Sequence, residues 1–471
     1  MPGQPSITVA PLSPDAPLPL VEQITDFIAR GIETRRFRAG MRMPSIRRFA
    51  AENAVSRFTV VEAYDRLVAQ GLLEPRRGSG FYVRERAQPV RAARDEAPLG
   101  SKIDVVWLLR NLYLENPRVL PAASGCTPND WFDPEMLAGA MRTLSRREGG
   151  AAVAYGTPQG YAPLRGLLQV LLAELEIEAA PDNIVLTAGA SHALDLVARH
   201  FLHPGDTVLV EEPGYYVLFA RLASLGMRLV GVPRGIDGPD VVRLEELMRE
   251  HRPKLLFLNS VLHNPTSTSL SAAVAFRVLR LAEEHDVTIV EDDVFADLHP
   301  GRAHRIAALD QLTRVIYVGS FSKTLSAGIR VGYLAARREL ARDLADQKML
   351  SSLTTPELGE RLVYNVLAEG QYRKHVERMR ARIARAIEPA ARNLERAGLT
   401  LLHEPGAGLF LWARPAEHHD AEVLAAKAAE QDILLAPGSL FSPTQARSPW
   451  MRFHVAYAAN PKLARFFEEV L

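Results

Sequence analysis

The sequence predicts an α/β protein in two parts, a small helical domain that ends in a hairpin and a large domain built on a mainly parallel sheet. The 471 residues exceed the ~250–300 at which a single hydrophobic core stops growing. A compact helical pattern occupies residues 18–84. From about residue 124 onward, apolar strand-like runs alternate with helical patterns, which is typical of a parallel sheet with crossover helices.

The composition excludes several classes of protein. Apolar residues make up 47% and charged residues 24%, as in ordinary globular proteins and unlike disordered or fibrous chains. A single cysteine, Cys126, forms no intrachain disulfide. No apolar run approaches the ~20 residues that cross a bilayer, and the proline-rich N-terminus lacks the apolar segment of a signal peptide. We therefore expect a cytoplasmic protein without membrane association.

The chain divides into four predicted segments. Residues 1–17 are proline-rich and are expected to form a flexible arm. Residues 18–84 form the small helical domain, and residues 85–118 hold a polar Ala/Pro-rich linker followed by a lead-in helix, VVWLLRNLYLEN. Residues 119–471 form the large α/β domain.

The small domain is predicted to be a helix-turn-helix with a β-wing. A first helix covers roughly residues 19–34, and the next two begin after the N-caps Ser45 and Ser56. The third helix directs Val60 and Tyr64 inward. Two short strands, 72–73 and 81–83, flank the turn EPRRGSG and complete the wing.

Charge on this domain points to a nucleic acid. Residues 30–86 hold thirteen arginines and no lysine against six acids, a net charge of +7 in a chain whose total is +1. The start of the third helix suits the major groove, and the wing suits the minor groove. For any single arginine, a solvated surface charge is an equally good interpretation. The predicted contacts to double-stranded DNA are Arg42, Ser45, Arg47, Arg57, Phe58, Thr59, Arg76, Arg77 and Gly78.

The segment AGMRMPSIRRFAAENAVSRFTVVEAYDRLVAQGLLEPRRGSGFYV resembles the winged-helix domain of the GntR superfamily, and the resemblance covers about residues 18–84. Phe58 departs from that pattern, because the family often has a small polar residue there. We expect this difference to alter base preference.

In the large domain, the unusual residues follow the strand-like runs IVLTA, TVLVEEP, KLLFLNS, VTIVEDD and RVIYVGS. Ligand sites of parallel sheets lie at the carboxyl ends of the strands. After the last run, SFSKTLSAGIRVGY places Lys323 in a serine-rich loop with Arg330 seven residues on. A lysine, hydroxyls and a guanidinium suit a phosphorylated carbonyl cofactor. Alternatively, such a lysine lies on the surface.

Three further motifs fit the same cofactor. IVLTAGASHALDL reads as strand, glycine turn and helix, and offers the backbone N–H groups of Ala190 and Ser191 to a phosphate. VTIVEDD ends in Asp292, a carboxylate suited to a pyridine nitrogen, although a metal pair or a helix N-cap are alternatives. No His or Cys cluster accompanies it, so we predict no metal site. Asn264 is expected to donate to a phenolate oxygen and Tyr215 to stack on the ring.

Together these motifs resemble fold-type I pyridoxal-phosphate enzymes of the class I/II aminotransferase family over about residues 120–471. The resemblance implies a PLP-dependent transferase fold with pyridoxal 5′-phosphate on the Schiff-base lysine Lys323, and Asp292 and Asn264 on its ring. Tyr155 would reach the partner's cofactor phosphate in a dimer, and Arg452 would grip a substrate α-carboxylate, unless it is a surface arginine on a late strand. The implied phosphate cup comprises Ala190, Ser191, Ser320, Ser322 and Arg330.

Two positions depart from the aminotransferase pattern. Where the family often has D-x-x-Y, with a tyrosine that bonds the cofactor, this chain has Phe295. The usual NPTG reads NPTS, with Ser267. Without this phenol, full transamination turnover is an open question, whereas cofactor binding is expected to be affected less.

A GntR-like winged helix joined to an aminotransferase-like domain is the layout of MocR-type transcription regulators. That resemblance implies a DNA-binding regulator whose large domain senses an amine, an amino acid or the cofactor itself through the Lys323 aldimine, and a head-to-tail homodimer. One alternative is an active aminotransferase, acting on an amino acid and a 2-oxo acid, with a fused DNA-binding domain. Another is a DNA-binding protein with an inactive scaffold.

Overall fold

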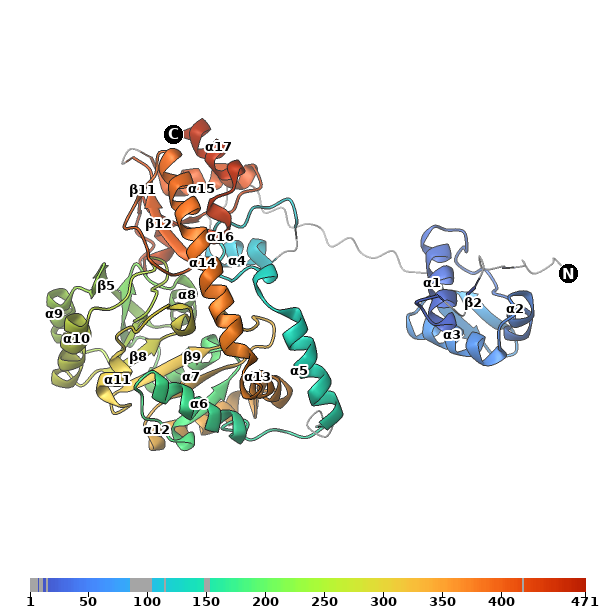
Figure 1. The fold of residues 1–471 in the computed structure, drawn as a ribbon, viewed down its shortest axis with the longest axis horizontal. Helices are drawn as coiled ribbons and strands as arrows, with labels where there is room; N and C mark the ends of the chain where they lie inside the picture. Colours follow the sequence, from blue (N-terminus) through green and yellow to red (C-terminus); the bar gives the residue numbers. More distant parts are fainter. Residues whose placement is uncertain are drawn as a thin grey trace. The chain divides into compact units, whose positions relative to one another are not determined.

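The computed structural model describes residues 7, 12–13, 16–84, 104–113, 116–147, 153–416 and 419–471. The chain separates into two compact units, Met1–Ser101 and Lys102–Leu471, which are described in turn (Figure 1). The predicted linker at 85–100 and most of the predicted arm lie outside the described residues. Within the arm, Ile7 is buried against the small domain, and its carbonyl accepts a hydrogen bond from Asn53 Nδ2 at 3.1 Å.

The small unit is the predicted helix-turn-helix with a wing. Ser45 and Ser56 cap the second and third helices, since their side chains accept from the backbone N–H groups of Arg48 and Thr59. Tyr64 lies at the centre of the core and donates to Pro44 O at 3.1 Å, which ties the third helix to the turn before the second. The elements are α1 Leu20–Glu33, α2 Ile46–Glu52, α3 Arg57–Ala69, β1 Leu73–Arg76 and β2 Gly80–Val83.

The wing strands extend further toward the turn than the sequence predicted. β1 and β2 are antiparallel, and their register runs from Leu73 opposite Val83 to Arg76 opposite Gly80. Gly78 lies between them with φ +73°, a left-handed conformation that glycine adopts without strain. Polar residues near the turn therefore pair as strands although they carry no apolar pattern.

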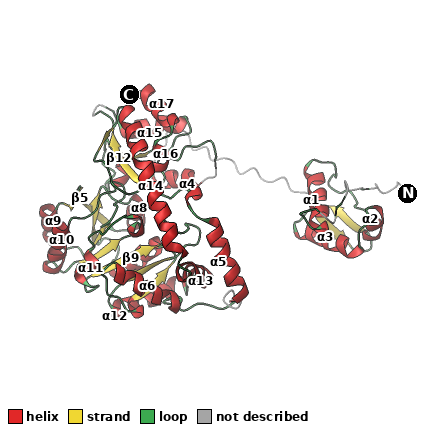
Figure 2. Cartoon of the chain, in the orientation of Figure 1, coloured by secondary structure: helices red, strands yellow, loops and turns green. Residues whose placement is uncertain are grey.

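The large unit contains an eight-stranded sheet in the order β3-β10-β9-β8-β7-β4-β5-β6. Strands are drawn in yellow in Figure 2. Five neighbouring strands, from β9 to β5, are parallel, and all five predicted runs form strands. β10 is antiparallel to both of its neighbours and joins β3 to the sheet. The strands are β3 Ile184–Thr187, β4 Thr207–Glu212, β5 Arg228–Gly235, β6 Gly238–Pro239, β7 Leu255–Leu258, β8 Thr288–Asp292, β9 Val315–Ser320 and β10 Gly332–Ala335.

Helices cover both faces of this sheet, because alternate strand residues point to opposite sides and both sets are apolar. Leu209 packs on one face, and Val208 and Val210 pack on the other. The first face is covered by α6 Ala162–Glu174, α9 Val241–His251, α10 Ala272–Glu284, α11 Ile306–Asp310 and α13 Glu357–Ala368. The second face is covered by α7 Ala190–Phe201, α8 Tyr216–Ser224 and α12 Arg338–Ser352.

A smaller antiparallel sheet forms the C-terminal part of the large unit, in the order β11-β12-β14-β13. The long helix α14 links it to the main sheet region (Figure 1). The strands are β11 Thr400–Leu401, β12 Phe410–Arg414, β13 Ala436–Pro437 and β14 Met451–His454. The remaining helices are α4 Val105–Tyr113, α5 Pro134–Arg147, α14 Gln371–Arg396, α15 Ala421–Glu430, α16 Val455–Ala458 and α17 Pro461–Val470. Short 3₁₀ helices lie at Asn129–Trp131, Pro181–Asn183, Ala296–Leu298 and Gly438–Phe441.

The predicted α/β fold class is confirmed, and the lead-in helix exists as α4. Among the described residues, none of the helices combines the length and apolar character that a bilayer crossing requires.

Candidate functional site: a cavity at the carboxyl ends of the strands

A cavity of about 1420 Å³ opens at the carboxyl ends of the parallel strands. Loops after β3, β4, β7, β8 and β9 contribute to its wall, as do Arg452 of β14 and helix α4. Tyr155 does not line it and is 82% exposed. The predicted residues that line it are Ala190, Ser191, Tyr215, Asn264, Asp292, Ser320, Ser322, Lys323, Arg330 and Arg452.

Lys323 lies in the loop after β9 and points into the cavity. Its Nζ donates to Gly125 O at 2.8 Å and lies 3.7 Å from Cys126 Sγ. The backbone of Lys323 is also held, because Thr127 Oγ1 donates to its carbonyl at 2.7 Å. The ammonium group of Lys323 lowers the pKa of the Cys126 thiol. The lysine is therefore a cavity group, which excludes the alternative of a surface lysine.

Asp292 ends β8 and carries a buried carboxylate oxygen, Oδ1, that has no hydrogen-bond partner among the described residues. Burial raises the pKa of this carboxyl to about 7, and repulsion from Asp293 adds to the rise. A buried acceptor without a partner is costly, so this oxygen suits a protonated nitrogen that enters the cavity.

An anion cup forms where α7 begins. Gly189 precedes the helix with φ +77°, and a Cβ there would lie 2.6 Å from Arg330 Nη2, so glycine permits the close approach of the guanidinium. Arg330 donates to Ser322 Oγ at 3.2 Å and to Ala188 O at 3.1 Å. Ser320 Oγ in turn donates to Ser322 Oγ at 3.1 Å. Two hydroxyls, a guanidinium and a helix N-terminus thus converge, which is a favourable arrangement for a phosphate.

Arg452 is fully buried, which excludes a surface arginine. Nη1 donates to Asn264 Oδ1 at 2.7 Å and Nη2 donates to Ala123 O at 2.5 Å, while Nε has no partner among the described residues. Its guanidinium carbon lies 4.6 Å from the ring centre of Phe410. No carboxylate of the described residues forms an ion pair with it.

The aromatic surroundings of Arg452 were not predicted from the sequence. Besides Phe410, the rings of Phe441 and Tyr216 lie 5.0 and 5.4 Å from its guanidinium carbon, and the Tyr216 hydroxyl lies 3.4 Å from Nη2. These rings stabilise the cation without neutralising it. Tyr216 follows Tyr215 in the EEPGYY motif, which was the available signal.

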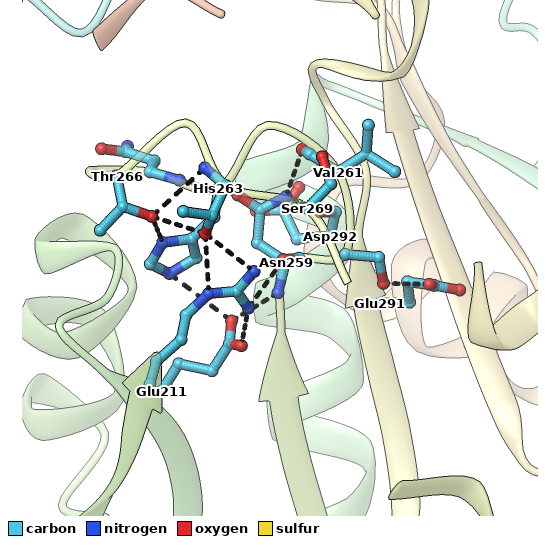
Figure 3. A network of polar contacts seen from close by, with 12 residues as sticks. Glu211, Asn259, Val261, His263, Thr266, Ser269, Glu291 and Asp292 are labelled. Carbon is cyan, nitrogen blue, oxygen red and sulfur yellow. Dashed lines mark hydrogen bonds and ion pairs between the residues drawn. The ribbon is translucent and has the colours of Figure 1, made fainter. Parts of the chain in front are cut away.

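A second group that the sequence did not indicate is the network of hydrogen bonds around Asn259, which Figure 3 shows together with Glu211 and Asp292. Asn259 Nδ2 donates to Asp292 O at 2.7 Å, and Asn259 Oδ1 accepts from Asn264 N at 2.9 Å. Glu211 anchors this amide by accepting from Asn259 N at 2.7 Å, and is itself paired with Arg234. Asn259 lies near the end of the run KLLFLNS, directly after strand β7, and this position was the only clue in the sequence.

The two departures from the aminotransferase pattern have clear local structure. Phe295 is buried, and its ring packs edge-on against Phe410 with 5.7 Å between ring centres. No hydroxyl is available at this position. Ser267 adopts φ +56°, the left-handed region that favours glycine, and its Oγ donates to Phe410 O at 2.8 Å. The serine hydroxyl therefore binds the backbone of β12, which offsets part of the conformational cost.

On the small unit, the predicted DNA contacts fall into two groups. Arg47, Arg57 and Arg77 are exposed, and within the described part of the chain no hydrogen bond or ion pair engages their side chains. Phe58 is 78% exposed at the start of α3, and Gly78 is exposed in the turn of the wing. Arg42 is exposed as well, but it already has an interaction partner.

The second group already has partners within the small unit. Ser45 Oγ accepts from Arg48 N in the cap of α2, and the hydroxyl of Thr59 lies 2.7 Å from Ser56 Oγ. Arg76 is held by Glu74 at 2.6 Å and lies over the Tyr82 ring. Contacts from these residues to DNA would require exchange of an internal bond.

Comparisons with known proteins agree with this arrangement. The bacterial regulatory proteins of the gntR family match residues 20–83, and the aminotransferase class I and II family matches residues 124–470. The uncharacterized HTH-type transcriptional regulator YdcR of Escherichia coli K12 is 30% identical over 93% of this chain and 94% of its own length. The 2-aminoadipate transaminase of Thermus thermophilus is 33% identical over 69% of this chain and 83% of its own length.

Among solved structures, LysN, the alpha-aminoadipate aminotransferase from Thermus thermophilus, superimposes with a TM-score of 0.70 at 29% identity. The match covers 77% of this chain and 95% of the LysN chain.

Proposed function

Because the chain belongs to the MocR-type transcription regulators, which join a GntR helix-turn-helix domain to an aminotransferase class I and II domain, we propose that its large domain binds pyridoxal 5′-phosphate and an amino-acid effector, and that the effector changes DNA binding. Such coupling requires that the effector bind more tightly to one DNA-binding state than to the other.

The residues of the cavity fit the cofactor. The unpartnered Asp292 Oδ1 suits the protonated ring nitrogen, and the anion cup at Ser322 and Arg330 suits the phosphate. Lys323 points into the same cavity. The LysN structure, which shares this fold, is a complex with N-(5'-phosphopyridoxyl)-L-leucine. When bound, the cofactor supplies an aldehyde that condenses with a primary amine, either that of Lys323 or that of an effector.

The observation that carries the proposal is Arg452, a fully buried guanidinium with no carboxylate partner among the described residues. An unpaired buried cation is unfavourable unless it serves a ligand. Its planar fork matches a carboxylate bidentately. An α-amino acid supplies both the amine for the cofactor and the carboxylate for Arg452.

The proposal is tested by titrating the cofactor-loaded protein with L-norleucine and with pentylamine, which is the same molecule without its carboxylate. We expect the visible absorbance of the cofactor to respond to norleucine at much lower concentration. The same ligands are then added to a DNA-mobility assay with the upstream region of the protein's own gene. Equal responses to both ligands would contradict a role for Arg452, and unchanged DNA mobility would contradict effector coupling.

Substitution Lys323→Ala removes the amine that the cofactor aldehyde requires. We expect loss of the visible absorbance and of the effect of norleucine on DNA mobility, with DNA binding itself retained because the winged helix is untouched. Lys427→Ala, which replaces an exposed lysine on α15, is the matched control and should behave as the natural protein. A Lys323→Ala protein that still responds to norleucine would disprove the covalent form of the proposal.

DNA binding is expected to depend most on the exposed arginines whose side chains bind nothing within the described small unit. Arg57→Ala should weaken specific binding roughly tenfold to a hundredfold, since a bidentate contact to guanine contributes about 1–3 kcal/mol. Arg76→Ala should have a smaller effect, because Glu74 already binds that side chain. Fluorescence anisotropy at several salt concentrations measures both. The opposite ranking would show that the wing, and not α3, carries recognition.

We further propose a head-to-tail homodimer, supported by Tyr155. This tyrosine is 82% exposed and lies outside its own cavity, as expected of a side chain that serves a partner subunit's phosphate. Sedimentation velocity on the cofactor-loaded protein tests the dimer. A monomer at micromolar concentration would contradict it.

An active aminotransferase is the second candidate function, favoured by the 33% identity to a transaminase. The buried Phe295 weakens it, because the chain offers no hydroxyl at that position. Incubation with amino donors and 2-oxo acids separates the two. Sustained turnover supports the enzyme, and a single half-reaction or none supports the sensor.

A further inference from the structure

We infer that the effector is an amino acid with one carboxylate and an uncharged, apolar side chain, and that helix α4 forms the wall that this side chain contacts. The inference rests on the proposed function and adds the chemical class of the effector. It also assigns α4, the first described helix after the segment 85–103, to the binding site.

The number of cations in the cavity argues against a second carboxylate on the effector. Among the described lining residues, the charged cations are Lys323, Arg330 and Arg452. In the proposed complex Lys323 stays beside the aldehyde carbon after the effector amine replaces it, Arg330 serves the phosphate and Arg452 serves the α-carboxylate. None of the three is then left for the side chain of the effector. His263 also lines the cavity, but burial lowers the pKa of its imidazole well below the usual value, so it is neutral. A second carboxylate would be desolvated without a counterion.

The wall beside Arg452 is apolar. Leu109 and Leu112 lie one turn apart on α4 and both line the cavity, together with Val217 of α8. Leu108, on the adjoining face of α4, is fully buried in a cluster with Tyr216 and Phe441, whose rings surround the Arg452 guanidinium. This packing fixes α4 next to the arginine. A side chain that extends from an α-carbon held there therefore meets leucine surface.

A cationic side chain is also disfavoured. Of the three carboxylates that line the cavity among the described residues, Glu211 is paired with Arg234 and Asp292 faces the proposed ring nitrogen. The third, Asp130, is exposed, and an ion pair with solvent access adds little affinity. The charges of the cavity thus select against both kinds of charged side chain.

Three ligands of matched shape test the inference on the cofactor-loaded natural protein. L-norleucine ends in a methyl group, L-2-aminoadipate carries a carboxylate in place of that methyl, and L-lysine adds an ammonium to it. We expect norleucine to bind roughly tenfold or more tightly than either, measured by cofactor absorbance and by isothermal titration calorimetry. Equal or tighter binding of 2-aminoadipate or of lysine would overturn the inference.

Substitution of one α4 residue should reverse the preference. Leu112→Arg places a guanidinium in the apolar wall, and we expect 2-aminoadipate to gain roughly tenfold in affinity while norleucine loses affinity. Leu112→Met changes the shape without the charge and should not favour 2-aminoadipate. Val106→Arg adds the same charge to α4 at a position that is 53% exposed and outside the cavity lining, and should leave the ranking unchanged.

The outcomes separate this inference from the proposed function. If none of the three amino acids alters the absorbance or the calorimetric signal, the proposed function fails. If they bind but Leu112→Arg leaves the ranking as in the natural protein, with an unchanged Tm as evidence of folding, α4 does not form the wall and the inference alone fails.

Discussion

Replacement of Arg452 by methionine is expected to weaken binding of an amino-acid effector by a factor on the order of 10²–10³, because the buried carboxylate of the ligand would lose its charged partner. The affinity for pentylamine, which has no carboxylate, should change little. Norleucine and pentylamine should then bind about equally to the variant. Calorimetric titration of both ligands into both proteins measures the coupling between the arginine and the carboxylate directly.

The same substitution is expected to leave the ligand-free protein at least as stable as the natural one. Arg452 is buried without a carboxylate partner among the described residues, so an apolar residue of similar length relieves a desolvated charge and should not lower the Tm of the ligand-free protein. Arg452→Lys keeps the charge but loses the planar guanidinium. Its affinity for norleucine should therefore lie between those of the natural protein and of Arg452→Met. A large drop in Tm for Arg452→Met would indicate that the aromatic contacts of Phe410 and Phe441 make this arginine a structural residue.

Substitution Asp292→Asn is expected to weaken cofactor binding and to stabilise the cofactor-free protein. The charged hydrogen bond to the ring nitrogen is lost, which corresponds to roughly a tenfold to hundredfold loss of cofactor affinity. Without cofactor, burial raises the pKa of Asp292 from 3.8 to about 7. Above pH ~4 the unfolded chain releases this proton, whereas the folded protein retains it until the pH approaches about 7. The contribution of this carboxyl to stability is therefore lost progressively as the pH rises from ~4 through the folded-state pKa.

Asparagine carries no such titration. The Tm of cofactor-free Asp292→Asn should equal that of the natural protein near pH ~4 and exceed it by about 2–5 °C at pH ~8. With cofactor present, the order should reverse at the higher pH. Differential scanning calorimetry at several pH values checks both, and Asp286→Asn, at an exposed position after α10, serves as control. A difference in Tm that does not vary with pH would contradict the raised pKa.

Much of the fold and most of the site could be predicted, because both depend on local patterns. The strand-like runs are apolar on both faces. Asp292 is the last residue of one strand, and the loops that follow two others carry Lys323 and Asn264. Because the carboxyl ends of parallel strands lie at the same edge of the sheet, residues that follow successive strands in the sequence come close together in space. The caps Ser45 and Ser56 act within one turn of helix and were therefore readable as well.

The parts that were missed depend on contacts between distant segments. Tyr216, Phe410 and Phe441 surround Arg452 from three different elements, and no local pattern relates them. Asn259 acts by bonding the backbones of Asp292 and Asn264, which a side-chain motif does not encode. Strand β10 was missed because its first two residues, Gly332 and Tyr333, end a motif that was interpreted for its lysine and arginine alone.

The antiparallel strand β10 has a consequence for synthesis of the protein. β3 lies at the edge of the sheet and pairs only with β10 among the described strands, and the anion cup draws Ser191 from the helix after β3 and Arg330 from the turn before β10. During translation, a chain that has emerged only as far as β9 thus holds β3 without its neighbour and half a cup. On the proposed function, a phosphate-bearing cofactor would find no complete cup until β10 has left the ribosome. We therefore expect a nascent chain that stalls earlier to gain no stability from the cofactor.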